Sequence, residues 1–294
     1  MRKLLLPLAA ALIWVAPASP STIFARNAQG VKLTANADGM AAVTFRERGL
    51  IRHLLAWGAI DDDVKFKLDY AGGWGYFHRQ VWKTIKACDG YDGPELDWLV
   101  AACKAPDGSY WAVQAWQRML PNLGYRPRNQ LERAREFHLA HWRGDLPKLE
   151  IYLDWVYEGR YEHLFGRYTY RGRPVHGFRS TSTGIPLDPY GRNIFLDTFD
   201  SAYGPGWRRE NSFLAHRPNG NFCYGFFPHK SYYDRSRRPA GHGRRYRATA
   251  MGPGVSPDVF WTAPALGDYN RAYDQQMNAL GDAIAGSDRL CRRH

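Results

Sequence analysis

The sequence feature that most constrains the fold is a series of short segments in which apolar and polar residues alternate. The clearest alternation covers residues 148–156, where Leu149, Ile151, Leu153 and Trp155 occupy every second position. A period of two places alternate side chains on opposite faces of a β-strand. We expect this strand to pair with residues 135–142, through a turn at residues 144–147.

Further strands are predicted along the chain at residues 31–60, 110–117, 164–170, 175–179, 193–198, 212–216, 222–227 and 245–250. Turn signals separate them at intervals typical of a sandwich or barrel. The spacing of apolar residues predicts helices over residues 76–88, 94–103 and 268–285. In the last of these, Tyr273, Leu280 and Ile284 fall on one side.

These patterns predict a mainly β fold: an antiparallel sandwich or jelly-roll-like domain with a few peripheral helices, stabilised by disulfides. Apolar residues make up 45% of the chain and aromatic residues 15%, which excludes a disordered protein because a large core can be buried. No polar linker divides the chain, so we expect one β-rich globular domain over residues 19–294.

The first 18 residues have the order of a secretory signal peptide. Arg2 and Lys3 precede an apolar run over residues 4–15, and small residues stand at Ala16 and Ala18. This run is shorter than the roughly 20 residues of a membrane-spanning helix. We therefore expect cleavage after Ala18, a secreted or periplasmic, cell-envelope location, and no membrane span in the mature chain.

Four cysteines follow the signal segment, and an even number in an exported chain favours disulfides. Three pairings are open; we prefer Cys88 with Cys103, and Cys223 with Cys291. No Cys-x-x-Cys motif is present, so neither a metal site nor a cofactor is expected. His138 and His141 are three residues apart, and on a strand they would point to opposite faces, which makes them a poor metal pair.

The positive charge is concentrated in one part of the sequence. Residues 201–250 contain ten basic and two acidic residues, a net charge of +8 out of +12 for the whole chain. Most of this charge falls in residues 230–247, where tyrosines lie among the arginines. Guanidinium groups bind phosphate, sulfate or carboxylate groups and stack on aromatic rings. The predicted ligand-binding residues are Tyr232, Tyr233, Arg235, Arg237, Arg238, Arg244, Arg245 and Arg247.

A second polar region covers residues 188–216 and could hold catalytic groups. If the protein is an enzyme, Asp197, Asp200, Glu210 and His216 are the candidates, because a glycosidase needs two carboxylates and a lyase needs groups that move protons. Salt-bridged structural acids are the alternative interpretation. Sequence motifs of serine hydrolases, zinc proteases and P-loop proteins are absent.

Three functional hypotheses follow. The first is a binding protein for an anionic extracellular or cell-envelope polymer, such as an acidic polysaccharide, through the arginine- and tyrosine-rich loop. The second is a carbohydrate-active enzyme, either a glycoside hydrolase or a polysaccharide lyase. The third is a structural envelope protein without a small ligand. Export argues against nucleic acid as the partner, and the sequence leaves the oligomeric state open.

Overall fold

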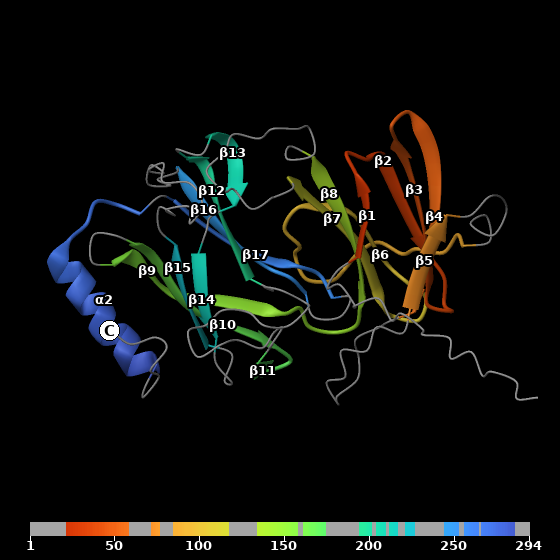
Figure 1. The fold of residues 1–294 in the computed structure, drawn as a ribbon. Helices are drawn as coiled ribbons and strands as arrows, with labels where there is room; N and C mark the ends of the chain where they lie inside the picture. The colour runs from red at the N-terminus through yellow and green to blue at the C-terminus, as the bar shows by residue number, and fades with distance from the viewer. Residues whose placement is uncertain are drawn as a thin grey trace, which may run out of the picture.

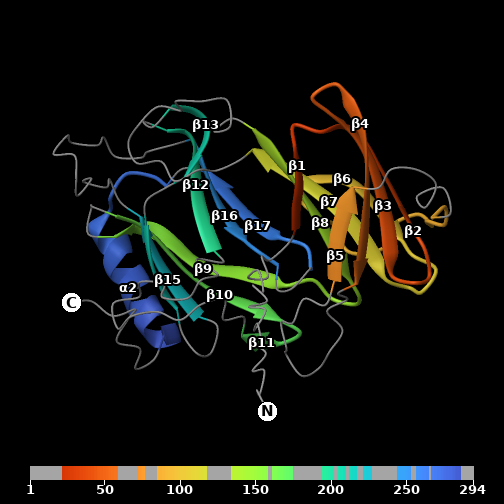
Figure 2. The ribbon, with the colours of Figure 1, turned by 45° about the vertical axis from the view of Figure 1, so that its right-hand side comes forward.

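The computed structural model describes residues 22–58, 72–76, 85–117, 134–157, 161–174, 194–201, 204–209, 212–216, 221–226, 244–252, 256–264 and 266–285. These residues form a mainly β fold whose strands pair antiparallel in four sheets, as the alternating segments predict. Figures 1 and 2 show an N-terminal half built from two sheets, a C-terminal half built from two more, and a helix at the outer edge of the C-terminal half.

The N-terminal half is a sandwich of two four-stranded sheets. Sheet A has the order β1-β8-β7-β6 and sheet B the order β2-β3-β4-β5. Apolar side chains from both sheets, among them Phe24, Phe45 and Phe137, form the core between them. The strands are β1 (Thr22–Arg26), β2 (Gln29–Ala35), β3 (Met40–Glu47), β4 (Leu50–Gly58), β5 (Gly72–Tyr76), β6 (Leu99–Lys104), β7 (Tyr110–Gln117) and β8 (Arg135–Trp142).

The C-terminal half repeats this arrangement with sheets C and D. Sheet C has the order β13-β12-β16-β17, and sheet D has the order β11-β10-β15-β14 with β9 on the other side of β10. Leu164, Leu196, Phe222 and Tyr246 belong to the core between them. The strands are β9 (Lys148–Tyr157), β10 (Tyr161–Tyr170), β11 (Arg173–Pro174), β12 (Ile194–Ser201), β13 (Gly204–Arg209), β14 (Ser212–His216), β15 (Asn221–Phe226), β16 (Arg245–Ala250) and β17 (Val259–Pro264).

A bulge in β9 divides its apolar side chains between two cores. The register with β10 shifts between Phe165 and Gly166, which leaves Tyr152 as an extra residue on β9. An extra residue reverses which face the following side chains occupy. Leu149 and Ile151 consequently pack against the core between sheets C and D, whereas Leu153 and Trp155 belong to a separate cluster on the outer face of sheet D.

Helix α2 (Arg271–Ala285) confirms the predicted C-terminal helix and covers that outer face. Met277 packs with Leu153 and Trp155, and the Trp155 indole Nε1 donates a hydrogen bond of 3.0 Å to Oδ1 of the buried Asp274. The side of the helix that carries Tyr273, Leu280 and Ile284 is exposed.

The helix predicted over residues 94–103 is wrong, because Leu99–Lys104 forms strand β6 beside β7. The helix predicted over residues 76–88 is also wrong at both ends: Tyr76 closes β5, and Ala87 bridges to Ala35. Residues 77–84 lie outside the described residues. The disulfide between Cys88 and Cys103 is present as predicted, and it joins the edge of sheet A to the preceding segment.

Three other predictions stay untested. Residues 1–18 lie outside the described part of the chain, so the signal peptide remains a prediction, as does the single domain over residues 19–294. The pairing of Cys223 with Cys291 also involves side chains beyond the described ones. Within the described residues, none of the helical structure is both long and apolar enough to cross a membrane.

Candidate functional site

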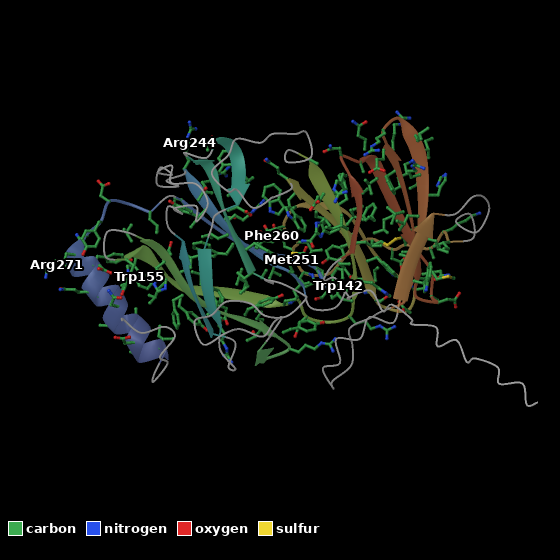
Figure 3. The ribbon with its side chains drawn as sticks, viewed as in Figure 1. Trp142, Trp155, Arg244, Met251, Phe260 and Arg271 are labelled. Atoms are coloured by element: carbon green, nitrogen blue, oxygen red, sulfur yellow. A yellow bond between two sulfur atoms is a disulfide. The ribbon has the colours of Figure 1, made fainter. Side chains whose placement is uncertain are left out.

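The arginines that can be placed from the predicted binding loop lie at the start of β16. Arg244 directly precedes β16 and Arg245 is its first residue; both are exposed, and Figure 3 shows Arg244 projecting from the upper side of the C-terminal half. The Arg244 side chain is 80% exposed and its Nη1 lies 3.9 Å from Oδ2 of Asp200. Five other predicted residues lie outside the described part of the chain: Tyr232, Tyr233, Arg235, Arg237 and Arg238.

Arg245 is held over two aromatic rings by the register of sheet C. Phe199 lies opposite Arg245 on one side and opposite Trp207 on the other, so the three residues form a row across neighbouring strands. The Arg245 guanidinium carbon lies 4.7 Å from the centre of the Phe199 ring and 5.7 Å from that of Trp207. A guanidinium that lies over aromatic rings can still bind an anion through the N–H groups at its edge.

Arg247 lies two residues further along the same face and is completely buried. Its Nη2 donates a hydrogen bond of 3.1 Å to Oδ2 of Asp197, and both side chains are 0% exposed. Its guanidinium carbon also lies 4.4 Å from the Trp207 ring centre, 5.3 Å from that of Trp98 and 5.9 Å from that of Phe260. Arg247 is therefore a buried structural residue of the site and is not accessible to a ligand.

Trp98 closes this cluster on the side of sheet A. Its ring is 39% exposed, and its φ of 58° lies in the left-handed region that bulky side chains rarely adopt. The backbone is fixed there because Ala115 N donates a hydrogen bond of 2.9 Å to the Trp98 carbonyl. A strained conformation of this kind costs on the order of 1–3 kcal/mol and is often found at functional positions.

The two candidate catalytic acids that the structure describes, Asp197 and Asp200, both have structural partners. Asp197 is neutralised by Arg247, as described above. Asp200 has a φ of 51°, and its Oδ1 accepts a hydrogen bond of 2.8 Å from Gly206 N, so it stabilises the turn between β12 and β13. The side chain of His216 and the whole of Glu210 lie outside the described residues. Salt-bridged and turn-forming acids are thus what the described residues contain.

The two halves of the molecule meet at a buried polar seam formed by Gln114, Trp116 and His138 of sheet A with Asp258 and Phe260. The Gln114 amide donates to the Asp258 carbonyl and accepts from Asp258 N, both at 3.0 Å. His138 stacks on Trp116 with ring centres 3.8 Å apart, and the Phe260 ring lies 5.1 Å from that of Trp116.

Burial in this seam lowers the pKa of His138 to about 3. The cause is the loss of hydration, which disfavours the charged imidazolium even though Asp258 Oδ2 lies 3.5 Å from His138 Nδ1. His138 is therefore neutral at pH 7. It does not add a positive charge to the site, and its role is to pack between the two halves.

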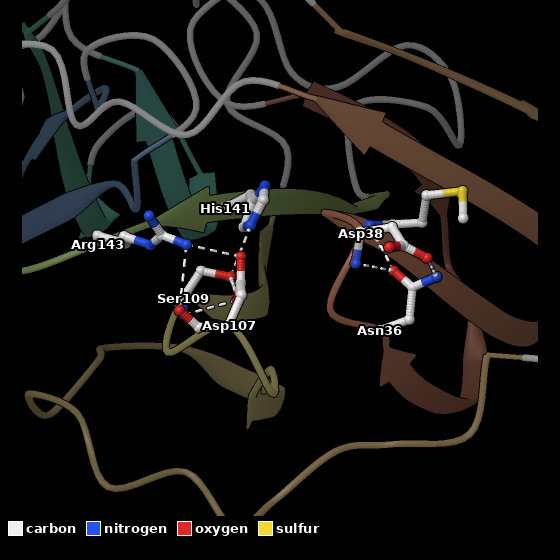
Figure 4. A network of polar contacts seen from close by, with 7 residues as sticks. Asn36, Asp38, Asp107, Ser109, His141 and Arg143 are labelled. Atoms are coloured by element: carbon white, nitrogen blue, oxygen red, sulfur yellow. Dashed lines mark hydrogen bonds and ion pairs between the residues drawn. The ribbon is translucent and has the colours of Figure 1, made fainter.

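A second polar network, shown in Figure 4, brings together an aspartate, a serine and a histidine. Ser109 Oγ lies 3.0 Å from His141 Nε2 and donates a hydrogen bond of 2.6 Å to Asp107 Oδ1, and Arg143 Nη2 donates to Asp107 Oδ2 at 2.8 Å. In a hydrolase triad the aspartate contacts the histidine and the serine is accessible. Here Asp107 contacts Ser109, and Ser109 is buried, so the network stabilises the β6–β7 turn.

His138 and His141 do point to opposite faces of β8, as their spacing predicts. His138 lies in the seam, whereas His141 stacks on Trp111 with ring centres 3.7 Å apart. No group of three potential metal ligands occurs among the described residues.

Four aromatic residues around the arginines were missed at the sequence level: Trp98, Phe199, Trp207 and Phe260. A sequence signal existed for Phe199. It follows Asp197 by two residues, the same spacing as between Arg245 and Arg247, and pairing of β12 with β16 places Phe199 opposite Arg245 and Asp197 opposite Arg247. No comparable signal linked Trp98 to sheet C, since its neighbour Arg247 is distant in the sequence.

No protein-family model matches this sequence, and neither the curated proteins nor the solved structures include a significant match to it.

Proposed function

We propose that the protein is exported and binds an anionic polymer, such as an acidic polysaccharide of the cell envelope, through the end of sheet C that carries Arg244 and Arg245. The observation that carries this proposal is the stacking of an exposed guanidinium, that of Arg245, on Phe199 and Trp207. The signal-peptide pattern of residues 1–18 supports the location.

The arrangement suits a polymer of repeated negative charges. A stacked guanidinium is held in one orientation, so less conformational freedom is lost when it binds a carboxylate or sulfate through two parallel hydrogen bonds. Arg244 adds a second exposed cation next to it. The half-exposed ring of Trp98, on the other side of the buried Arg247, offers an apolar face on which a sugar ring can pack.

The test is retention of the mature protein on immobilised polygalacturonate and heparin, with affinity measured by calorimetry at low and high salt. We expect R244A/R245A to lose most of the binding, and wild-type binding to weaken as salt screens the charges. R245K keeps the charge but not the planar group, so an intermediate affinity is expected. W98G removes the ring at a position where glycine suits the backbone, and should weaken binding to the polysaccharides.

The matched control is K148A/R271A, which removes two exposed positive charges from β9 and α2. If this control reduces retention as much as R244A/R245A, the binding reflects net charge alone and the site is wrong. Undiminished binding by R244A/R245A would refute the proposal directly.

A further inference from the structure

The turn between β3 and β4 exposes two large aliphatic side chains. Leu50 is 57% exposed and Ile51 is 63% exposed. Consecutive strand residues point to opposite faces, so one of two neighbours is normally covered by the sandwich. Because both are exposed here, the end of this hairpin extends beyond the sheet that covers the rest of β3 and β4.

The turn itself is tight and basic. Glu47 pairs with Leu50, and Arg48 and Gly49 between them have φ values of 51° and 79°, as in the two-residue turns that close hairpins. Arg46 and Arg48 are exposed beside the two aliphatic side chains. Two acids lie near the turn in the described part of the chain: Glu47 accepts a hydrogen bond of 3.0 Å from the backbone N of Arg26, and Glu136 pairs with the Arg26 side chain at 3.3 Å.

A chain of contacts leads from the turn across sheet A to the C-terminal half. Arg26 lies beside the turn, and the backbone N of the next residue, Asn27, donates a hydrogen bond to the Arg135 carbonyl. Arg135 in turn pairs with Gln117 on β7. Gln117 in turn contacts the Trp207 carbonyl of sheet C.

The same chain ends at the proposed polymer site. Trp207 pairs with Phe199, whose carbonyl accepts from Arg244 N. Figures 1 and 3 show the β3–β4 turn and Arg244 on the same upper side of the view, on different halves of the molecule. Among the described residues, the exposed arginines at the hairpin itself are Arg46 and Arg48, with Arg26 beside the turn, whereas Arg244 and Arg245 belong to the other half.

We propose that this end of the molecule docks onto an anionic lipid bilayer, with Leu50 and Ile51 entering the headgroup region and the arginines contacting the negative headgroups. Aliphatic groups that protrude from a basic surface match a bilayer surface, which is apolar inside and negatively charged outside. A second copy of this chain does not match, because joining two such ends would bring Arg46 and Arg48 of both copies together.

Flotation of the mature protein with vesicles tests this proposal, using phosphatidylcholine alone and phosphatidylcholine with 30% phosphatidylglycerol. We expect binding to the anionic vesicles and little to the neutral ones. L50S/I51S should lower the binding at least about tenfold, because the buried aliphatic groups are lost. R46A/R48A should also lower binding to the anionic vesicles, and the loss should be larger at low salt than at high salt, where the charges are screened.

The matched control is Y273S/L280S, which removes two similarly exposed apolar side chains from α2 and should float like the wild type. Equal flotation of L50S/I51S and the wild type, or equal loss in the control, would overturn the proposal. So would a wild-type dimer in gel filtration that L50S/I51S converts to a monomer without any vesicle binding.

The polymer proposal is tested separately by the same variants. L50S/I51S leaves Arg244 and Arg245 unchanged, so its retention on polygalacturonate should equal that of the wild type. Loss of vesicle binding with intact polymer binding supports two distinct contacts. A parallel loss of both would show that the hairpin substitutions act through the general structure, and would overturn the assignment of Leu50 and Ile51.

Discussion

The buried pair of Asp197 and Arg247 gives the sharpest test of the structure. Unit charges 3.1 Å apart attract by about 5 kcal/mol at an effective dielectric constant of about 20. That attraction is largely offset by the dehydration of both groups, so the pair itself adds little net stability. Removing one partner is different, because the remaining charge stays buried and loses this ion pair. D197L and R247M should each lower the free energy of unfolding by about 3–5 kcal/mol.

The double variant D197L/R247M removes both charges and replaces them with apolar side chains. We expect it to be more stable than either single variant, because no uncompensated charge remains. Urea unfolding followed by tryptophan fluorescence and far-UV circular dichroism measures these differences. Trp98 and Trp207 adjoin Arg247, so their fluorescence reports on the same region.

The control for this experiment is the exposed ion pair of Lys104 with Asp92, whose N–O distance is 2.8 Å. Water and salt screen exposed pairs, so D92N should leave the unfolding midpoint unchanged. The reasoning would be refuted by single variants at Asp197 and Arg247 that unfold at the wild-type midpoint. A double variant whose loss equals the two single losses combined would also refute it.

Two more predictions concern stability. The C88S/C103S variant should lower the free energy of unfolding by about 3 kcal/mol, because the disulfide closes a loop of 15 residues in the unfolded chain; a wild-type urea midpoint would contradict this. Burial lowers the pKa of His138 to about 3 and that of His163 to about 4. The unfolded chain therefore binds more protons below the ordinary histidine pKa of about 6.5, and stability should fall from pH 6.5 downward. H138Q should have a shallower slope of stability against pH, and an unchanged slope would count against the burial of His138.

Most of the strands could be predicted because alternation is a local property, but the predicted pairing of residues 148–156 with residues 135–142 is wrong: β9 pairs with β10, and β8 pairs with β1 and β7. The strands around residues 110–117, 135–142 and 148–156 follow directly from a period of two. The segment at residues 94–103 was misread because Leu96 and Val100, or Leu99 and Cys103, also have helical spacing. Pairing with β7 and the disulfide decide for the strand, and neither is a local signal.

The bulge at Tyr152 could not be predicted for the same reason. The sequence alone places Leu149, Ile151, Leu153 and Trp155 on one face, and only the register with β10 divides them between two cores. Helix α2 was predicted correctly, but not which side it buries. That side is set by Asp274, whose hydrogen bond to Trp155 joins residues 119 positions apart.

The candidate site was predicted in part. The concentration of arginine near residue 245 was evident from charge, and it leads to the exposed Arg244 and Arg245. The pairing of Asp197 with Arg247 joins two strands 50 residues apart, so the aspartate was read as a possible catalytic acid and the arginine as a possible ligand contact. Their burial is a property of the folded sheets and has no signature in either segment.

The amide of Gln114 has a further consequence for binding. By donating to the Asp258 carbonyl and accepting from Asp258 N, it pairs with that residue as a neighbouring strand would, and so resists sliding between the two halves. The hairpin on one half and the arginines on the other then keep a constant spacing. Two individually weak contacts with a single charged surface gain avidity from such a spacing, because the first contact raises the effective concentration of the second.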